Sequence, residues 1–188
     1  MGDKLSGEQG RLLLALARTT LKYRLLGGDA PQPPEDPALL TPAATFVTLK
    51  IKGNLRGCIG NLQAVGSLWE GIRDNAANAA FHDHRFSPLK KEELEKLHLD
   101  ISILSSPQPL QYADPALLPG KLRPGVDGVI VRDGRRSATF LPQVWQQLPD
   151  PQQFLDHLCL KAGLSESAWR QKKLEIEVYQ VQCFAEEI

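Results

Sequence analysis

Cysteine is scarce in this 188-residue chain, which carries only Cys58, Cys159 and Cys183. The three lie far apart in the sequence, so they form neither a disulfide framework nor a run of zinc ligands. Few, scattered cysteines are typical of a protein whose thiols stay reduced. We therefore predict a cytoplasmic protein without structural disulfides.

An excess of charge of either sign is also missing, because 22 Lys and Arg residues balance 22 Asp and Glu residues. This balance argues against a broad nucleic-acid surface and against electrostatic attachment to a membrane. No apolar run approaches the roughly 18 residues that a membrane span needs. The first residues lead into an amphipathic helix rather than a secretory signal, and neither a phosphate-binding loop nor a dinucleotide fingerprint occurs. We expect no nucleic-acid or membrane partner, and no cofactor is indicated.

Two capping boxes mark the starts of predicted helices. Ser6 with Gln9 precedes a helical leucine pattern that ends at Gly27–Gly28, and Ser67 with Glu70 precedes a second helix. The segment between the first helix and the next strand is rich in proline and is predicted to be a loop. The apolar positions expected on the inner side of the first helix are Leu12, Leu13, Leu16 and Leu21.

Alternating apolar and polar residues predict the strands. A strand over 46–51 is expected to turn at Gly53–Asn54 into a second strand over 55–60. Residues 99–103 alternate with Asp100 on the polar side, as in a strand with one wet face. These strands are expected to lie together in one sheet.

The composition changes after residue 105, because residues 105–127 hold five prolines. This change predicts a subdomain of about 105–135, inserted between two parts of a larger domain. A hairpin that turns at Asp133–Gly134 and a helix from Pro151 follow, and the last strand shifts its alternation after Val178, which indicates a bulge or burial of both faces. The fold class is therefore α+β, with a mixed sheet flanked by helices and a smaller subdomain from the middle of the chain.

The six residues Leu55–Gly60, Leu-Arg-Gly-Cys-Ile-Gly, are the most informative stretch of the chain. Because side chains alternate along a strand, Arg56 and Cys58 are expected on one side, about 7 Å apart. A guanidinium beside a thiol favours the reactive thiolate. Gly57 and Gly60 leave room for a ligand or another backbone and offer N–H donors. The alternative is a buried strand in which Cys58 is an apolar filler and Arg56 pairs with a core carboxylate.

A second candidate lies in the loop after the second helix, where Asp83 and Arg85 stand two residues apart. These side chains either contribute to a ligand site or satisfy backbone groups and each other in a surface loop. His82 and His84 flank Asp83 as in a metal site. Third and fourth ligands are not visible nearby, so no metal site is predicted.

Gln143 is a third candidate, at the predicted start of a helix after Pro142. Its amide can both donate to and accept from a ligand. The positive end of a helix dipole would favour an anion there. The alternative is an ordinary capping side chain.

Further stretches match a known pattern together with Leu55–Gly60. They are Thr48–Lys50, Asn78–Ala80, Asp83–Phe86, Leu89 with Glu92–Leu94, Ile101–Ser105, Gly125 with Asp127–Val129, Leu141–Val144 and Leu158–Leu164. On these residues, over about 8–185, the chain resembles the AMMECR domain family, whose bacterial and archaeal members are called AmmeMemoRadiSam system protein A. The family usually has proline where this chain has His84, which argues against a role for that histidine.

The resemblance implies an α+β fold in which both ends of the chain build a larger domain and the middle builds a smaller one. It also implies two partners, a Memo-like protein similar to metal-dependent dioxygenases and a radical S-adenosylmethionine protein. Such an association implies a pathway that acts on a small molecule or a modified protein.

These residues support two functional hypotheses. In the first, the chain is an enzyme or an enzyme subunit with Cys58 as nucleophile or proton carrier. Its pocket binds a small anionic substrate and is lined by Arg56, Cys58, Asp83, Arg85 and Gln143. In the second, the chain is a non-catalytic binding or scaffold protein, and Leu55–Gly60 is a rigid ledge for a partner.

Overall fold

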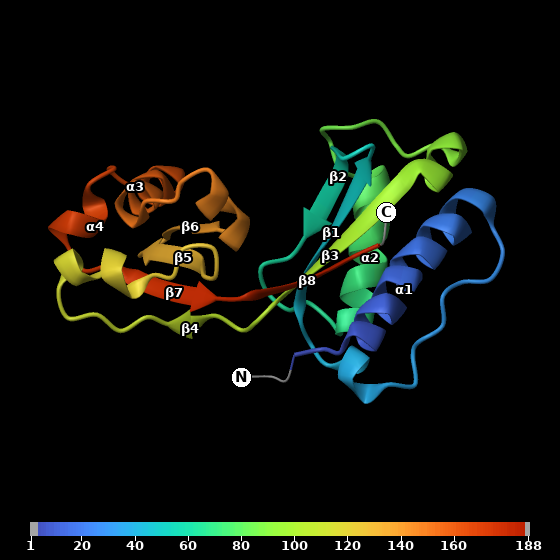
Figure 1. Cartoon of the computed structure of the whole chain (residues 1–188), viewed down its shortest axis with the longest axis horizontal. Coiled ribbons are helices and arrows are strands. Elements are labelled where there is room, and N and C mark those ends of the chain that lie inside the picture. The colour runs from blue at the N-terminus through green and yellow to red at the C-terminus, as the bar shows by residue number, and fades with distance from the viewer. Residues whose placement is uncertain (1–3, 187–188) are drawn as a thin grey trace. The chain divides into compact units, whose positions relative to one another are not determined.

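The computed structural model describes residues 4–186, which fold into two compact units (Figure 1). The first unit consists of Met1–Ser105 and Gln182–Ile188, and the second is Ser106–Val181. Each unit contains one antiparallel sheet with its own helices, so the predicted α+β class is confirmed, with two sheets in place of one mixed sheet. The expected subdomain of about 105–135 makes up only the first part of the second unit, because its strand pairs with strands that come later in the chain.

The first unit has two layers, a four-stranded sheet and two helices. Its elements are α1 (Gly7–Leu26), β1 (Ala44–Ile51), β2 (Asn54–Gly60), α2 (Leu68–Phe81), β3 (Leu97–Leu104) and β8 (Val181–Ala185), with short 3-10 helices η1 (Pro37–Leu40) and η2 (Lys91–Lys96). The strands lie in the order β2-β1-β3-β8, and Figure 1 shows α1 and α2 running beside them. Both predicted capping boxes are present, because Ser6 and Ser67 each accept a hydrogen bond from the third helical residue.

The core of the first unit lies between the helices and one face of the sheet. Leu49 of β1 and Ile101 of β3 are fully buried in the same apolar cluster as Leu13 and Leu21 of α1. Leu12 was predicted on the inner side of α1 but is half exposed. Leu13 and Leu21, about two turns apart, set the buried stripe of α1 instead.

The other face of this sheet is polar, as the alternation around Asp100 predicts. Thr48 and Lys50 of β1 point to it, because the residues on either side of Thr48 are fully buried on the helix side. β1 and β3 pair so that Thr48 lies opposite Asp100 and Lys50 lies opposite His98. We call this side of the sheet the polar face. Phe46 of β1 lies on it as well, and its other residues are Cys58, Thr48, Lys50, His98, Asp100 and Ser102.

The hairpin between β1 and β2 turns at Lys52 and Gly53, so the predicted turn at Gly53–Asn54 is wrong by one residue. Lys52 and Gly53 have φ angles of 51° and 78°, and Ile51 pairs with Asn54 across the turn. Positive φ at both central residues is what a two-residue type I′ turn requires. Lys52 and Gly53 are therefore the two central residues of the turn.

A β-bulge lies in β2, just after this turn. Consecutive residues Leu49 and Lys50 of β1 lie opposite Gly57 and Leu55, so Arg56 is an extra residue without a partner. Simple alternation along β2 therefore does not place the Arg56 side chain.

The second unit is also a sheet with helices. Its elements are β4 (Gln108–Pro109), η3 (Pro115–Leu117), η4 (Pro119–Lys121), β5 (Gly128–Asp133), β6 (Arg136–Phe140), η5 (Pro142–Gln146), α3 (Pro151–Lys161), α4 (Ala168–Gln171) and β7 (Glu175–Tyr179). The strand order is β4-β7-β5-β6. Val131 and Ile176 of the sheet share a core with Phe154 of α3, whose ring stacks on Trp145 with centroids 3.7 Å apart.

The alternation shift predicted after Val178 marks a break between two strands. β7 ends at Tyr179 in the second sheet, and β8 begins at Val181 in the first, so the chain changes sheets there rather than bulging. None of the helices within residues 4–186 combines the length and the apolar character that crossing a membrane requires.

Replacing Lys52 by Asn should stabilise the chain by up to about 1 kcal/mol, because asparagine adopts positive φ at lower cost than lysine. Urea unfolding of the two proteins measures the difference. Lys4→Asn is the control, since Lys52 is the one non-glycine residue with positive φ in the described part of the chain. Equal unfolding midpoints for wild type and Lys52→Asn would contradict the argument.

Candidate functional site

Arg56 binds a carboxylate of its own unit. Its Nε and Nη2 donate to the two carboxylate oxygens of Glu93 at 2.7 and 2.9 Å, and Nη2 also donates to the carbonyl oxygen of Ser87 at 3.0 Å. The side chain is 13% exposed and its guanidinium lies over the ring of Phe86. These hydrogen bonds hold the pKa of Glu93 below its usual value. Among the described residues, no hydrogen bond joins this guanidinium to the Cys58 thiol, and Arg56 Nη1 is buried without a hydrogen-bond partner. Nε and Nη2 therefore make structural contacts, and Nη1 makes none.

The side chains of Asp83 and Arg85 bind the backbone of β2 along the edge that no other strand pairs with. The Cys58 N–H donates to Asp83 Oδ2 at 2.9 Å, and Arg85 Nη2 donates to the Cys58 carbonyl oxygen at 3.2 Å. Arg85 also makes a bidentate pair with Asp83, at 2.9 and 2.7 Å. The Arg85 guanidinium thereby holds the pKa of the buried Asp83 carboxyl far below its usual range. Asp83 and Arg85 together bind both the N–H and the carbonyl oxygen of Cys58. These contacts agree with the interpretation in which the two side chains satisfy backbone groups and each other.

The two glycines of the motif make room for neighbouring groups of the protein. A Cβ at Gly57 would overlap the carbonyl oxygen of Ala79, so α2 approaches β2 closely at that position. A Cβ at Gly60 would overlap the ring of Phe46, which lies opposite it in the ladder. The close approach expected at Gly57 is therefore that of another backbone.

The Cys58 thiol lies on the polar face and is half-buried. Thr48 is its cross-strand partner, and the Thr48 hydroxyl donates to Cys58 Sγ at 3.2 Å. A hydroxyl donor stabilises negative charge on sulfur. The thiol is thus hydrogen-bonded without being sealed, which differs from the apolar-filler interpretation.

Beyond Thr48, the polar face carries a group of three charged or titratable side chains. Asp100 lies opposite Thr48, forms an ion pair with Lys50, and has Oδ1 3.4 Å from Nε2 of His98. The sequence places Asp100 on the wet side of a strand, but the alternation does not show that Asp100 lies opposite Thr48. The partner strand is what brings these residues near Cys58.

His82 and Asp83 do not join this group, and Gln143 lies in the other unit. His82 Nδ1 lies 3.0 Å from Asn78 Oδ1, while the Asp83 carboxylate is occupied by Arg85. Gln143 belongs to the second unit and lies in the first turn of η5, a five-residue 3-10 helix that begins at Pro142. Pro149 restricts the residue before it to extended conformations, which prevents η5 from continuing.

The chain matches the family model AMMECR1 over residues 14–184 and belongs to the AMMECR1 family. A protein of Methanosarcina acetivorans is 40% identical over 188 residues, covering 97% of this chain and 94% of its own length. A protein of Thermofilum pendens is 37% identical over 200 residues, covering 97% of this chain and 92% of its own length. A crystal structure of the uncharacterised protein PH0010 from Pyrococcus horikoshii has a TM-score of 0.84 at 34% identity, covering 98% of this chain and 95% of that one.

Replacing Asp83 by Asn should cost roughly 2 kcal/mol of unfolding free energy at pH 7, because it removes charge-assisted hydrogen bonds. The folded-state pKa of Asp83 is depressed, so its stabilisation is present above the unfolded pKa of about 3.9 and fades as the pH falls below that value. The gap between wild type and variant should therefore narrow at pH 3, measured by urea unfolding at both pH values. Asp74→Asn, at an exposed ion pair, is the control. A gap that is equal at pH 7 and pH 3 would refute the role given to the carboxylate.

Proposed function

We propose that this chain is an enzyme of small-molecule or protein modification, or a subunit of one, in which the Cys58 thiol reacts on the polar face. The observation that supports this proposal is the hydrogen bond from Thr48 to the Sγ of Cys58, a residue that is only half-buried. The Thr48 hydroxyl is a hydrogen-bond donor placed at the sulfur of the proposed nucleophile. The carbonyl and N–H of Cys58 are both bound, so its strand is rigid at the point where reaction would take place.

In this proposal the acid–base group is His98, oriented by Asp100. His98 Nε2 and Asp100 Oδ1 lie 3.4 Å apart on β3, two strands from Cys58. Asp100 is in register with Cys58 through Thr48, about 10 Å away for strands about 4.8 Å apart, whereas His98 lies two residues further along β3, about 12 Å away. A small substrate lying over Thr48 has the Cys58 thiol on one side of it and the His98–Asp100 pair on the other. Lys50 beside Asp100 supplies the positive charge for an anionic substrate, the role first expected of Arg56.

We also propose that the chain acts in the cytoplasm, together with the Memo-like and radical S-adenosylmethionine proteins that the family resemblance implies. A reactive thiol suits a reducing compartment. In this proposal the polar face binds the small molecule or modified residue on which those partners act.

The alternative is a non-catalytic binding protein, and one observation favours it. Leu55, Leu62 and Val65, in β2 and the loop after it, are exposed apolar residues, with Val65 exposed to 80%. β2 is held rigidly by the bonds of Asp83 and Arg85. A rigid strand with exposed apolar neighbours offers a partner protein a surface to bind.

The rate of Cys58 alkylation by iodoacetamide at neutral pH tests the first proposal. Peptide mass spectrometry separates it from the alkylation of the exposed Cys183, an internal reference. Cys58 should react faster than Cys183 although it is less exposed, and Thr48→Val should slow it about fivefold, the equivalent of one hydrogen bond of about 1 kcal/mol. Cys58 reacting more slowly than Cys183, with no effect of Thr48→Val, would refute the thiol chemistry.

Binding of the two implied partner proteins to the immobilised chain tests the alternative. Leu62→Asp and Val65→Asp should abolish capture of the partner if this loop is the docking surface. Leu160→Asp, at an exposed leucine of the second unit, is the matched control. Undiminished capture by the loop variants would contradict the alternative, and the alkylation rates decide the first proposal independently.

A further inference from the structure

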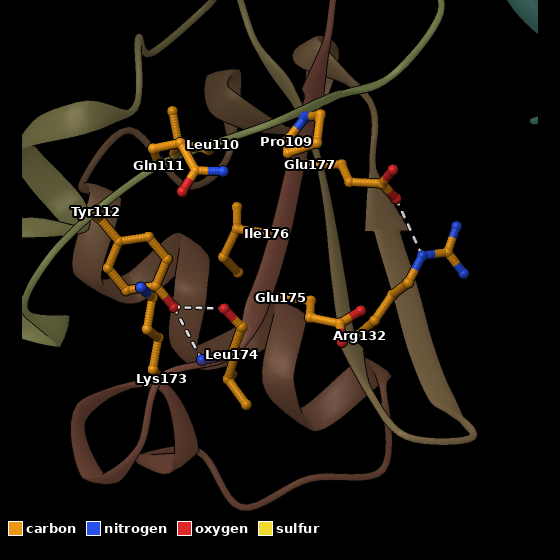
Figure 2. A pocket seen from close by; sticks show the side chains of 10 residues that line it. All are labelled: Pro109, Leu110, Gln111, Tyr112, Arg132, Lys173, Leu174, Glu175, Ile176 and Glu177. Carbon is orange, nitrogen blue, oxygen red and sulfur yellow. Dashed lines mark hydrogen bonds and ion pairs between the residues drawn. The ribbon is translucent and has the colours of Figure 1, made fainter.

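A cavity of about 480 Å³ lies in the second unit, between β7 and the segment that follows β4 (Figure 2). Its volume lies in the range of pockets that hold small molecules. β4 pairs with β7 over only two residues, and the Leu110 N–H then donates to the carbonyl oxygen of Ile176 at 2.8 Å. After Leu110 the chain leaves the ladder, which creates the hollow.

Tyr112 fixes the far wall of this cavity. Its hydroxyl accepts from the N–H of Leu174 at 2.8 Å and donates to the carbonyl oxygen of the same residue at 2.6 Å, the two dashed lines beside Tyr112 in Figure 2. Tyr112 is buried, so this wall is held firmly. The cavity is therefore shaped before any ligand arrives, which lowers the entropic cost of binding.

The rim carries two cations and two anions, and only one pair is matched. Arg132 Nε donates to Glu177 Oε2 at 3.0 Å. For the Glu175 carboxylate, no hydrogen bond or ion pair with another described residue is present, although Glu175 lies opposite Arg132 in the ladder. The Lys173 ammonium lies 5.5 Å from the ring centroid of Tyr112 and pairs with no carboxylate within residues 4–186. Glu175 and Lys173 are both exposed to solvent, so one negative and one positive group border the same cavity without a charged partner among the described residues.

We propose that this cavity binds a small zwitterion, an amino carboxylate with an apolar body. The ligand's ammonium pairs with Glu175 and its carboxylate with Lys173, two residues away. The apolar body lies against Pro109 and Leu110, which line the same cavity. A ligand of single charge would pair with only one of the two exposed rim groups and would therefore bind more weakly than the zwitterion. This site is separate from the thiol chemistry proposed for the polar face.

Three probes of matched shape test the proposal on the full chain, with amide NMR shifts as the readout. Leucine is the zwitterion, 4-methylpentanoate lacks its ammonium group, and 3-methylbutylamine lacks its carboxylate. Leucine should shift the resonances around the cavity with a Kd in the millimolar range, and each analogue should bind at least about tenfold more weakly.

Variants assign the binding to the rim. Glu175→Gln and Lys173→Met should each weaken leucine binding about tenfold. Glu166→Gln and Lys121→Met, exposed and outside the cavity, should leave it unchanged. Cys58→Ser should also leave it unchanged, so failure here and failure of the thiol proposal are separate results. The amide spectrum of each variant verifies that it is folded.

Three results would overturn the proposal. The first is the absence of saturable shifts at the cavity in the millimolar range. The second is equal affinity for leucine and either analogue, which would mean that one charge suffices. The third is full leucine binding by folded Glu175→Gln or Lys173→Met.

Discussion

The Asp83 carboxylate determines where the Cys58 thiol can be, because it binds the backbone of the strand that carries the thiol. β2 is the edge of its sheet, and an edge strand has peptide groups that no neighbouring strand satisfies. Asp83 accepts the Cys58 N–H, and Arg85 donates to the Cys58 carbonyl. Two side chains thus take the place of the missing strand. These bonds tie the loop after α2 to the edge of the sheet. The Cys58 side chain projects from this fixed backbone onto the polar face.

Local signals in the sequence predict the helices and strands well. The conformation of one residue, Lys52, nevertheless changes how β1 and β2 pair. The capping boxes at Ser6 and Ser67 and the strand alternation act within a few residues, so they can be recognised without the fold. Lys52 adopts positive φ, which propensity does not indicate for lysine. The turn therefore comes one residue early, and the bulge after it makes Arg56 an extra residue. The expectation that Arg56 lies beside Cys58 depended on unbroken alternation.

The sequence does not predict the partners of the candidate residues, because each partner comes from a segment that is distant along the chain. Glu93 binds Arg56 across 37 residues, and Asp100 lies opposite Thr48 only because β3 pairs with β1. The sequence does show that Asp100 is on a wet face. Strand pairing decides which other residues share that face, and pairing is a property of the whole sheet.

The two units show how charge pairing separates structural residues from candidate binding residues. In the first, Arg56 and Arg85 each have a bidentate carboxylate partner, and the buried Asp83 carboxylate has the donors that its burial demands. A ligand that replaced either carboxylate would have to break a contact on which the fold depends. Glu175 and Lys173 border a cavity, and their charges are compensated by no group of opposite sign in the described chain. The hexapeptide that dominates the sequence nevertheless holds one buried polar atom without a partner among the described residues, Arg56 Nη1, whereas Glu175 and Lys173 are exposed to solvent and lie outside it.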